Sequence, residues 1–296
     1  MSDHPRQVRV VDVFTEKALA GNQLAVVLDG RDMSAELMQS IAREMNFSET
    51  TFILPPVDPS HAARVRIFTP FMELPFAGHP TIGTAWVLHA EGLVKSAEFV
   101  LEENVGPVKV HGVDGVWWMD HPALTFGDVF AHKQVASTIG IAEDWIIHDV
   151  PAQIASTGTG FLFVAVRDAG AVDAGTPDPA RVRKLLRRSG AHGVVVFTAG
   201  GNGRLYARMF GEDVPEDPAT GSAAGPLGAF AVRYGLVPRA PRVSIVSEQG
   251  TKMGRQSFLR IELEYGDTNS KEIPTRIQVG GGVMPVLTGT LADFGR

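Results

Sequence analysis

The chain has 296 residues, a length that suits two domains or one large domain. Hydrophobic residues make up 44% and charged residues 20%, which is the balance of a globular protein with a full core and not of a disordered chain. The net charge of −6, without a cluster of Lys and Arg, argues against nucleic acid binding, and the absence of cysteine excludes disulfides, thiolate nucleophiles and Cys-ligated metals.

The first residues lead into a strand-like run and not into the apolar region of a signal peptide. The longest apolar runs, such as residues 160–166, are too short to cross a bilayer. We therefore expect a cytoplasmic protein that has neither nucleic acid nor a membrane as a partner.

The N-terminal half alternates short strands with two helices. Alternating apolar residues predict strands over residues 8–14, 24–28, 50–54, 64–68 and, with hairpin turns at 104–106 and 114–115, across 97–119. Helical spacing predicts one helix that is N-capped by Ser34 and another over residues 80–89. The stretch 121–128 breaks this rhythm and is the candidate domain boundary.

The C-terminal half repeats the same kinds of element. Predicted helices cover residues 179–188 and 219–234, and predicted strands cover 194–197, 205–210, 243–247, 258–263, 275–279 and 283–291. Strands outnumber helices and hairpin signals are frequent, so we expect mainly antiparallel mixed sheet and not a run of βαβ units.

A short internal repeat links the two halves. Residues 73–79 align without gaps on residues 216–222, so that Glu73 matches Glu216 and Gly78 matches Gly221 at the same offset. Two unrelated strand-to-helix turns could share these common residues. We favour duplication, because each copy follows a predicted strand and opens a helix of small and apolar residues.

Both copies are suited to binding an anion. Proline in the first turn of a helix sacrifices no hydrogen bond, and glycine permits close backbone approach. The unpaired N–H groups and the positive dipole end of such a helix start can hold a carboxylate or phosphate. Two helix starts, one from each domain, facing a common cleft would hold a small anion between them.

Several polar residues lie near these helix starts. His79 and Ser222 occupy equivalent positions of the repeat, and Asp217 lies just before the second helix. Each has an ordinary structural interpretation: a satisfied core histidine, or for Asp217 a turn or cap residue before proline. Glu49, where a helix gives way to an apolar strand, is either a linker residue or a partly buried acid/base with a raised pKa.

Other catalytic motifs are missing from the sequence. It contains no Gly-x-Gly-x-x-Gly after a strand, no Gly-Lys-Ser/Thr phosphate loop, no Gly-x-Ser-x-Gly elbow and no His pair at metal-ligand spacing. Hydride transfer, nucleotide hydrolysis, serine esterase chemistry and zinc catalysis are therefore disfavoured. Proton transfer without a cofactor remains.

Motifs along the whole chain resemble those of the PhzF-like phenazine-biosynthesis family. The stretches that carry the resemblance are residues 11–14 with 21–22, 46–52, 68–84, 216–227, and 249–250 with 253–255. The resemblance implies the diaminopimelate epimerase-like α+β fold, in which two similar domains each wrap a mainly antiparallel mixed sheet round a central helix. It places the domains at residues 1–122 with 284–296 and at 123–283.

The resemblance also implies the site residues. Glu49 would be the acid/base, His79, Asp217 and Ser222 the other catalytic groups, and Gly78, Gly221 and Thr220 the substrate-binding residues; no metal or cofactor is implied. A homodimer with its active site in the cleft between the domains is expected. Related epimerases and racemases use two cysteines, and this chain has none.

The leading hypothesis is therefore a cofactor-independent isomerase that shifts a proton between carbons of a small cyclic or amino carboxylic acid, similar to dihydro-hydroxyanthranilate isomerase. An epimerase or racemase is the first alternative, and it would need a second base, for which Asp217 is a candidate. The second alternative is a non-catalytic binding or regulatory protein on the same scaffold. The set of polar site residues argues against that alternative, since an adaptor needs none of them.

Overall fold

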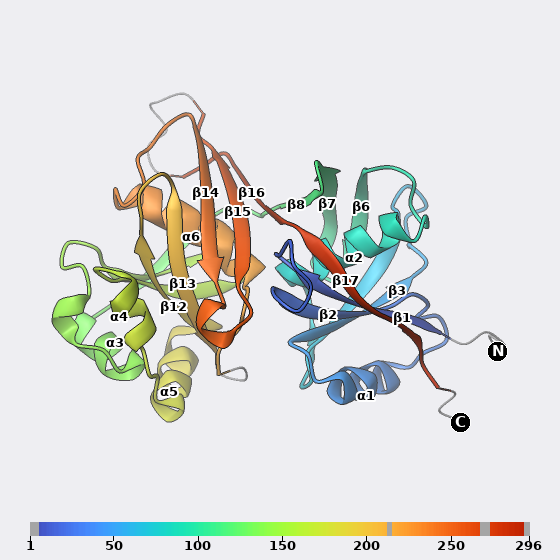
Figure 1. Cartoon of the computed structure of the whole chain (residues 1–296), viewed down its shortest axis with the longest axis horizontal. Helices are drawn as coiled ribbons and strands as arrows, with labels where there is room; N and C mark the ends of the chain where they lie inside the picture. The colour runs from blue at the N-terminus through green and yellow to red at the C-terminus, as the bar shows by residue number, and fades with distance from the viewer. Residues whose placement is uncertain (1–5, 212–214, 267–272, 293–296) are drawn as a thin grey trace. The chain divides into compact units, whose positions relative to one another are not determined.

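The chain divides into two compact units. The computed structural model describes residues 6–211, 215–266 and 273–292 (Figure 1). Unit 1 comprises residues 1–120 and 280–296, and unit 2 comprises residues 121–279. These junctions lie close to the expected ones at 122/123 and 283/284.

Unit 1 is a mixed sheet with two helices. Its strands are β1 (Gln7–Val13), β2 (Asn22–Val27), β3 (Glu49–Leu54), β4 (Ala63–Phe68), β5 (Glu73–Leu74), β6 (Glu98–Glu103), β7 (Gly106–Val113), β8 (Val116–Asp120) and β17 (Val283–Thr290). Its helices are α1 (Ala35–Met45) and α2 (Gly78–Ala90). The last strand of the chain, β17, pairs antiparallel with β1, so the chain returns to unit 1.

Unit 2 has more helices on its sheet. Its strands are β9 (Thr125–Phe130), β10 (Ala152–Ser156), β11 (Gly160–Ala165), β12 (Gly193–Ala199), β13 (Arg204–Gly211), β14 (Arg242–Gln249) and β15 (Ser257–Glu264). Strand β16 (Arg276–Gly281) begins in unit 2 and ends in unit 1. Its helices are α3 (His132–Ile139), α4 (Ala169–Ala174), α5 (Pro179–Ser189) and α6 (Gly221–Arg233), with short 3-10 turns at Glu143–Trp145 and Thr251–Met253.

The strand pairings repeat between the units. In unit 1, β2 and β3 are parallel, β3 and β4 are antiparallel, and β4 and β6 are parallel on either side of α2. Unit 2 has the same order of pairings: β11 and β12 are parallel, β12 and β13 are antiparallel, and β13 and β14 are parallel, with α6 between β13 and β14 in the chain. The structure therefore confirms the expected α+β fold of two similar halves.

A buried helix lies at the centre of each unit. Helix α2 contacts β1, β2, β3, β7, β8 and β17, and α6 contacts β10, β11 and β15. Both helices have 13 residues, are apolar on nearly all sides, and begin at Gly78 and Gly221, which confirms the predicted equivalence of these glycines. Small residues allow this packing: a Cβ on Gly83 would lie 2.5 Å from Leu24 Cδ2.

The other helices cover the opposite side of each sheet. Helix α1 starts at the predicted cap, where the Ser34 hydroxyl accepts the Leu37 N–H, and ends at Asn46 in the left-handed conformation. It buries Met38 and Ile41 in an apolar cluster with β2, β3 and β4. A separate cluster in unit 2 packs α3, α4 and α5 against β10, β11 and β12.

One strand at the start of unit 2 was not predicted. Residues 121–128, the candidate domain boundary, include the start of β9 at Thr125, which pairs with β10. Its side chains are mostly exposed, so its sequence carries little apolar alternation. Within the described part of the chain, no helix is long and apolar enough to cross a membrane.

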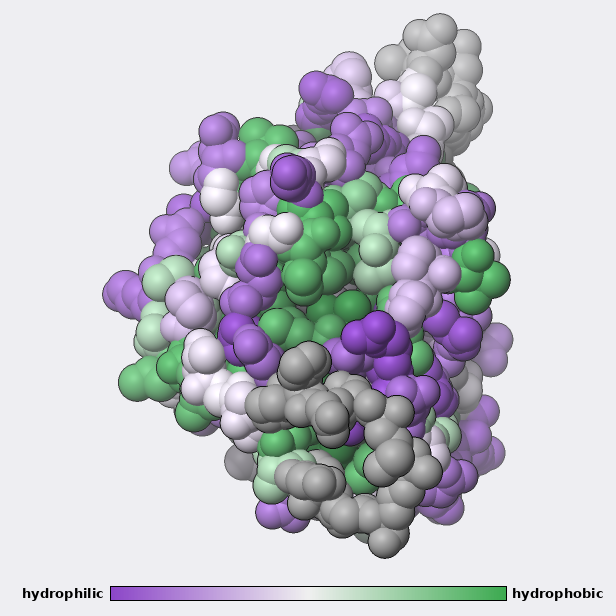
Figure 2. Space-filling view, turned by 90° about the vertical axis from the view of Figure 1, so that its right-hand side faces the viewer, coloured by the Kyte–Doolittle hydropathy of each residue, from purple (hydrophilic) through white to green (hydrophobic). Residues whose placement is uncertain are grey.

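Hydrophobic side chains also reach the surface. Figure 2 shows them gathered on one face of the molecule, among hydrophilic residues. Strand β17 carries two apolar side chains of this kind, with Val286 39% exposed and Leu287 55% exposed. Such exposed apolar residues are candidates for contact with another chain.

Candidate active site

Glu49 and His79 lie together in unit 1. Glu49 is the first residue of β3, and His79 is the second residue of α2. Glu49 Oε2 lies 3.4 Å from His79 Nε2, and the Glu49 side chain is 16% exposed. The fold thus brings the predicted acid/base against the predicted helix start, with the carboxylate partly shielded from water.

The contacts of His79 fix where its proton lies. The Gln23 carbonyl oxygen lies 3.3 Å from His79 Nε2 and can only accept, so Nε2 carries the hydrogen. The Asn22 side-chain amide lies 3.3 Å from Nδ1 and donates to it. Burial lowers the pKa of His79 to about 3, against a weaker opposing effect of the Gln23 hydrogen bond. His79 is therefore neutral near pH 7; its Nε2–H is directed to the Gln23 carbonyl, and Glu49 Oε2 lies 3.4 Å from the same nitrogen.

A second polar group lies before α6 in unit 2. The Thr220 hydroxyl donates to Asp217 Oδ2 at 2.7 Å. The Gln249 side-chain amide donates to the Asp217 carbonyl at 2.8 Å and to Thr220 Oγ1 at 3.0 Å, while its oxygen accepts the Thr220 N–H at 3.3 Å. Asp217, Thr220 and Gln249 are all buried, so this loop is tied to the end of β14.

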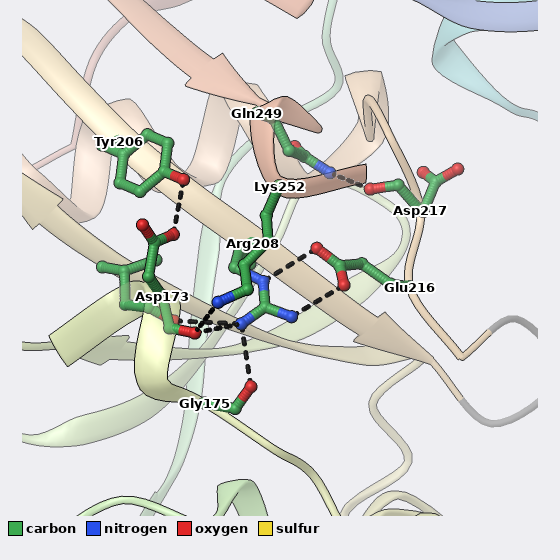
Figure 3. Close-up of polar contacts among 9 residues, drawn as sticks. Asp173, Gly175, Tyr206, Arg208, Glu216, Asp217, Gln249 and Lys252 are labelled. Carbon is green, nitrogen blue, oxygen red and sulfur yellow. Dashed lines mark hydrogen bonds and ion pairs between the residues drawn. The ribbon is translucent and has the colours of Figure 1, made fainter. Parts of the chain in front are cut away.

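A buried arginine supports the same loop (Figure 3). Arg208 of β13 binds Glu216 through two parallel bonds of 2.8 Å. Its Nη1 also donates to the carbonyls of Val172, Asp173 and Gly175 at the end of α4. The fork of Arg208 therefore joins α4 to the residue immediately before Asp217.

Unit 1 has a matching pair. Arg66 of β4 binds Glu73 of β5 through two bonds of 2.7 Å. Glu73 and Glu216 are the aligned glutamates of the repeat, so the same pairing precedes both central helices. This pairing is additional support for duplication.

Both central helices begin without a side-chain cap. Ala77 occupies the N-cap position of α2 and Thr220 that of α6, but neither side chain accepts a hydrogen bond from the first turn of its helix. The first N–H groups of a helix have no partner within the helix and lie at its positive end. Gly78, Gly221 and Ser222 therefore stand where a bound carboxylate would be favoured.

The structure groups the predicted residues within each unit. It brings Glu49 to His79 in unit 1, and it brings Asp217 and Thr220 together beside Gly221 and Ser222 in unit 2. Sequence reasoning assigned no role to Asn22, Gln249 or Arg208. Asn22 and Gln249 lie in stretches that carry the family resemblance, which was the available signal; nothing in the sequence marked Arg208.

Among the residues that the structure describes, no group of three or more His, Asp or Glu side chains could hold a metal ion.

Comparisons with known proteins agree along the whole chain. The family model described as phenazine biosynthesis-like protein matches residues 11–289. An isomerase of Mesorhizobium japonicum named as uncharacterized is 36% identical, over 97% of this chain and 98% of its own. Trans-2,3-dihydro-3-hydroxyanthranilate isomerase of Pseudomonas chlororaphis is 34% identical, over 95% of this chain and 98% of its own.

A solved structure supports the same relationship. The phenazine biosynthesis protein of the PhzF family from Bacillus anthracis has a TM-score of 0.88 and 25% sequence identity, and the match covers 98% of this chain and 100% of that one. The similarity thus extends over both units and not over one of them alone.

Proposed function

Because the chain belongs to the phenazine biosynthesis-like family and is an isomerase, we propose that it shifts a proton between two carbons of a small cyclic or amino carboxylic acid, with Glu49 as the acid/base and no cofactor. The contact between Glu49 and the neutral His79 is the observation that carries the proposal.

Glu49 is suited to both halves of such a reaction. Its carboxylate takes a proton from one carbon of the substrate, the double bond moves, and the resulting carboxylic acid returns the proton to another carbon. No atom or electron is gained or lost. The neutral His79 ring lies beside the Glu49 carboxylate without the tight ion pair that a cationic imidazolium would form, so the carboxylate keeps its basicity towards the substrate.

The start of each central helix provides a place for negative charge. Deprotonation at carbon leaves the substrate anion with additional charge, which the N–H groups at Gly78 and Gly221 can stabilise. We propose that Asp217, Thr220 and Ser222 orient the substrate in the same reaction, with Gln249 and Arg208 holding their loop.

The first substrate to test is trans-2,3-dihydro-3-hydroxyanthranilate, because a relative 34% identical over nearly its whole length is named for it. The reaction should be run in D₂O and followed by NMR. An isomerase moves the double bond and delivers hydrogen to a new carbon, whereas an epimerase places solvent deuterium at a single stereocentre and leaves the bonds in place. The second pattern would contradict the proposal.

Glu49→Gln tests the role of the carboxylate. Glutamine keeps the shape of the side chain but cannot carry the proton, so kcat should fall by about 10²- to 10⁴-fold. Glu44→Gln, an exposed change on α1, is the matched control and should keep full activity. Equal kcat values for the two variants, with unchanged melting temperatures, would refute Glu49 as the acid/base.

The family resemblance also implies a homodimer and a cytoplasmic enzyme, and we propose both. Exposed apolar residues such as Leu287 are consistent with a contact between chains. Sedimentation equilibrium measures the assembly directly: twice the mass of the chain is expected, and the mass of a single chain at micromolar concentration would contradict a stable dimer.

A further inference from the structure

Three consecutive residues, the last of β6 and the two in the turn before β7, contact the start of helix α2 and the segment before it. Glu103 Oε1 lies 2.6 Å from Thr81 Oγ1, in the first turns of the helix. The Asn104 side chain donates to Glu73 Oε1 at 2.9 Å, and the Val105 N–H donates to the Pro75 carbonyl at 2.9 Å. These three contacts therefore fix the position of the segment that leads to His79.

The two contacts of the Thr81 hydroxyl can both be hydrogen bonds only if the Glu103 carboxyl group is protonated. The Thr81 hydroxyl has one hydrogen, and it lies 2.8 Å from the Ala77 carbonyl, which can only accept. When that hydrogen is donated to Ala77, Thr81 Oγ1 can only accept from Glu103. Glu103 must then donate, and only the neutral carboxylic acid has a hydrogen to give.

Burial favours the same protonation state. Glu103 is 6% exposed, and its second oxygen is buried without a hydrogen-bond partner among the described residues. This burial raises the pKa of Glu103 to about 8. Near pH 7 most molecules therefore carry the neutral acid.

Charged groups on the neighbouring elements are engaged elsewhere or face solvent. Arg66 of β4 and Glu73 of β5 bind each other, and Glu102 accepts from the amides of residues 57 and 58 and contacts His61. Lys109 of β7 is exposed, and Arg64 of β4 is opposite Glu102 in the sheet. The titratable side chains of α2 itself are His79 and His89. None of these groups is a cause of the shift at Glu103.

Unit 2 has an uncharged residue in the matching place. Gln249 ends β14, the strand after α6, as Glu103 ends β6, the strand after α2. Both side chains are buried and bind the start of the preceding central helix: Gln249 binds Thr220, and Glu103 binds Thr81. An amide thus does in unit 2 what a neutral carboxylic acid does in unit 1.

We propose that Glu103 is a positioning residue of the active site: as a neutral carboxylic acid it fixes the start of α2, and so the position of His79 beside Glu49, and its ionisation releases that helix start. A carboxylate cannot donate to Thr81. Thr81 would have to turn its hydrogen from the Ala77 carbonyl to Glu103, which leaves that carbonyl with only the Thr81 N–H, at 3.2 Å. The proposal relies on the proposed function only in treating His79 as a site residue.

The proposal predicts a specific pH dependence of stability. The pKa of Glu103 is raised on folding from 4.5 to about 8, so stability is lost as pH rises through this window and levels off above it. One proton released on ionisation changes the unfolding equilibrium constant tenfold per pH unit. Glu103→Gln, which can donate to Thr81 and does not titrate, should therefore gain stability relative to wild type by up to tenfold per pH unit between about pH 5 and 8.

The experiment measures unfolding by urea from pH 5 to 9 for wild type, Glu103→Gln and two further variants. Glu102→Gln removes the neighbouring carboxylate on the other face of β6 and should keep the wild-type dependence in this range. Thr81→Val keeps the shape but removes the acceptor, so it should destabilise the chain at all pH values. Parallel curves for wild type and Glu103→Gln would overturn the proton-dependent contact.

Two further measurements test the positioning role. Amide hydrogen exchange at residues 78–84, corrected for the intrinsic effect of pH, should speed up above pH 8 in wild type and not in Glu103→Gln. Activity on trans-2,3-dihydro-3-hydroxyanthranilate should fall about tenfold between pH 7 and 9 in wild type, as the neutral fraction falls, and fall less in Glu103→Gln. Equal exchange in both proteins would overturn the positioning role, whereas lack of turnover in both proteins would count against the substrate and leave the exchange result decisive.

Discussion

Protonating His79 is a sharp test of the site geometry, because its two ring nitrogens have opposite roles. In the folded chain Nε2–H faces the Gln23 carbonyl and Nδ1 accepts from Asn22. A second proton on Nδ1 would point at the amide hydrogens of Asn22 in a buried place. Burial accordingly lowers the pKa of His79 from 6.5 to about 3.

The sign and size of the effect on stability follow. Because the unfolded chain binds this proton near pH 6.5 and the folded chain does not until about pH 3, stability is lost as pH falls through that window. At pH 5, which is about 1.5 units below the unfolded pKa, the loss is about 2 kcal/mol relative to neutral pH. A loss of that size lowers the melting temperature by several degrees.

The assay compares how the unfolding free energy of each variant changes with pH, so that the contributions of other acid-sensitive groups cancel. His79→Gln retains a side-chain N–H for the Gln23 carbonyl but does not titrate, and its unfolding free energy should lose about 2 kcal/mol less than that of wild type between pH 7.5 and 5. His148→Gln is the control, since the His148 side chain is 97% exposed. If His79→Gln and wild type lose stability in parallel, His79 is not a buried neutral base and the assigned hydrogen positions are wrong.

Two other substitutions test the packing and the support of the site. Gly83→Ala should destabilise the chain by about 1–3 kcal/mol in urea unfolding, because its Cβ would lie 2.5 Å from Leu24 Cδ2, whereas Gly201→Ala has nothing within 4 Å and should be near neutral. Arg208→Lys should cost about 3 kcal/mol, because lysine cannot bind a carboxylate through two bonds and three carbonyls at once, while Arg242→Lys at an exposed pair should cost less than about 1 kcal/mol. Similar losses for the two arginine variants would contradict the role given to Arg208.

Local sequence was enough for the central helices. Gly, Pro and small residues at a constant offset predicted two equivalent helix starts, and α2 and α6 begin at Gly78 and Gly221. The prolines of the repeat, Pro75 and Pro218, lie three residues before these starts, so the expectation that they stand in the first turn was wrong. The other features depend on backbone freedom and side-chain size, which neighbouring residues set. The resemblance to the PhzF-like family, carried by the same motifs, predicted the fold class.

The helices and strands between residues 129 and 178 were not predicted. Strand β10 and helix α4 are short, and α4 has only six residues, so neither offers a long enough period to recognise. The parallel pairing of β11 with β12 joins segments separated by two helices. Pairings of this kind depend on the finished sheet and not on the residues of one strand.

The sequence by itself determined which groups are available: no thiol, two helix starts suited to anions, and Glu49, His79 and Asp217 near them. Only the tertiary structure decided their state. His79 meets Asn22 and Gln23 from β2, and Glu103 meets Thr81 from α2, so each loses its water through contacts with a distant segment. Removal of water disfavours the charged form of any group, and that is why one histidine is held neutral by a lowered pKa and one glutamate is held neutral by a raised pKa.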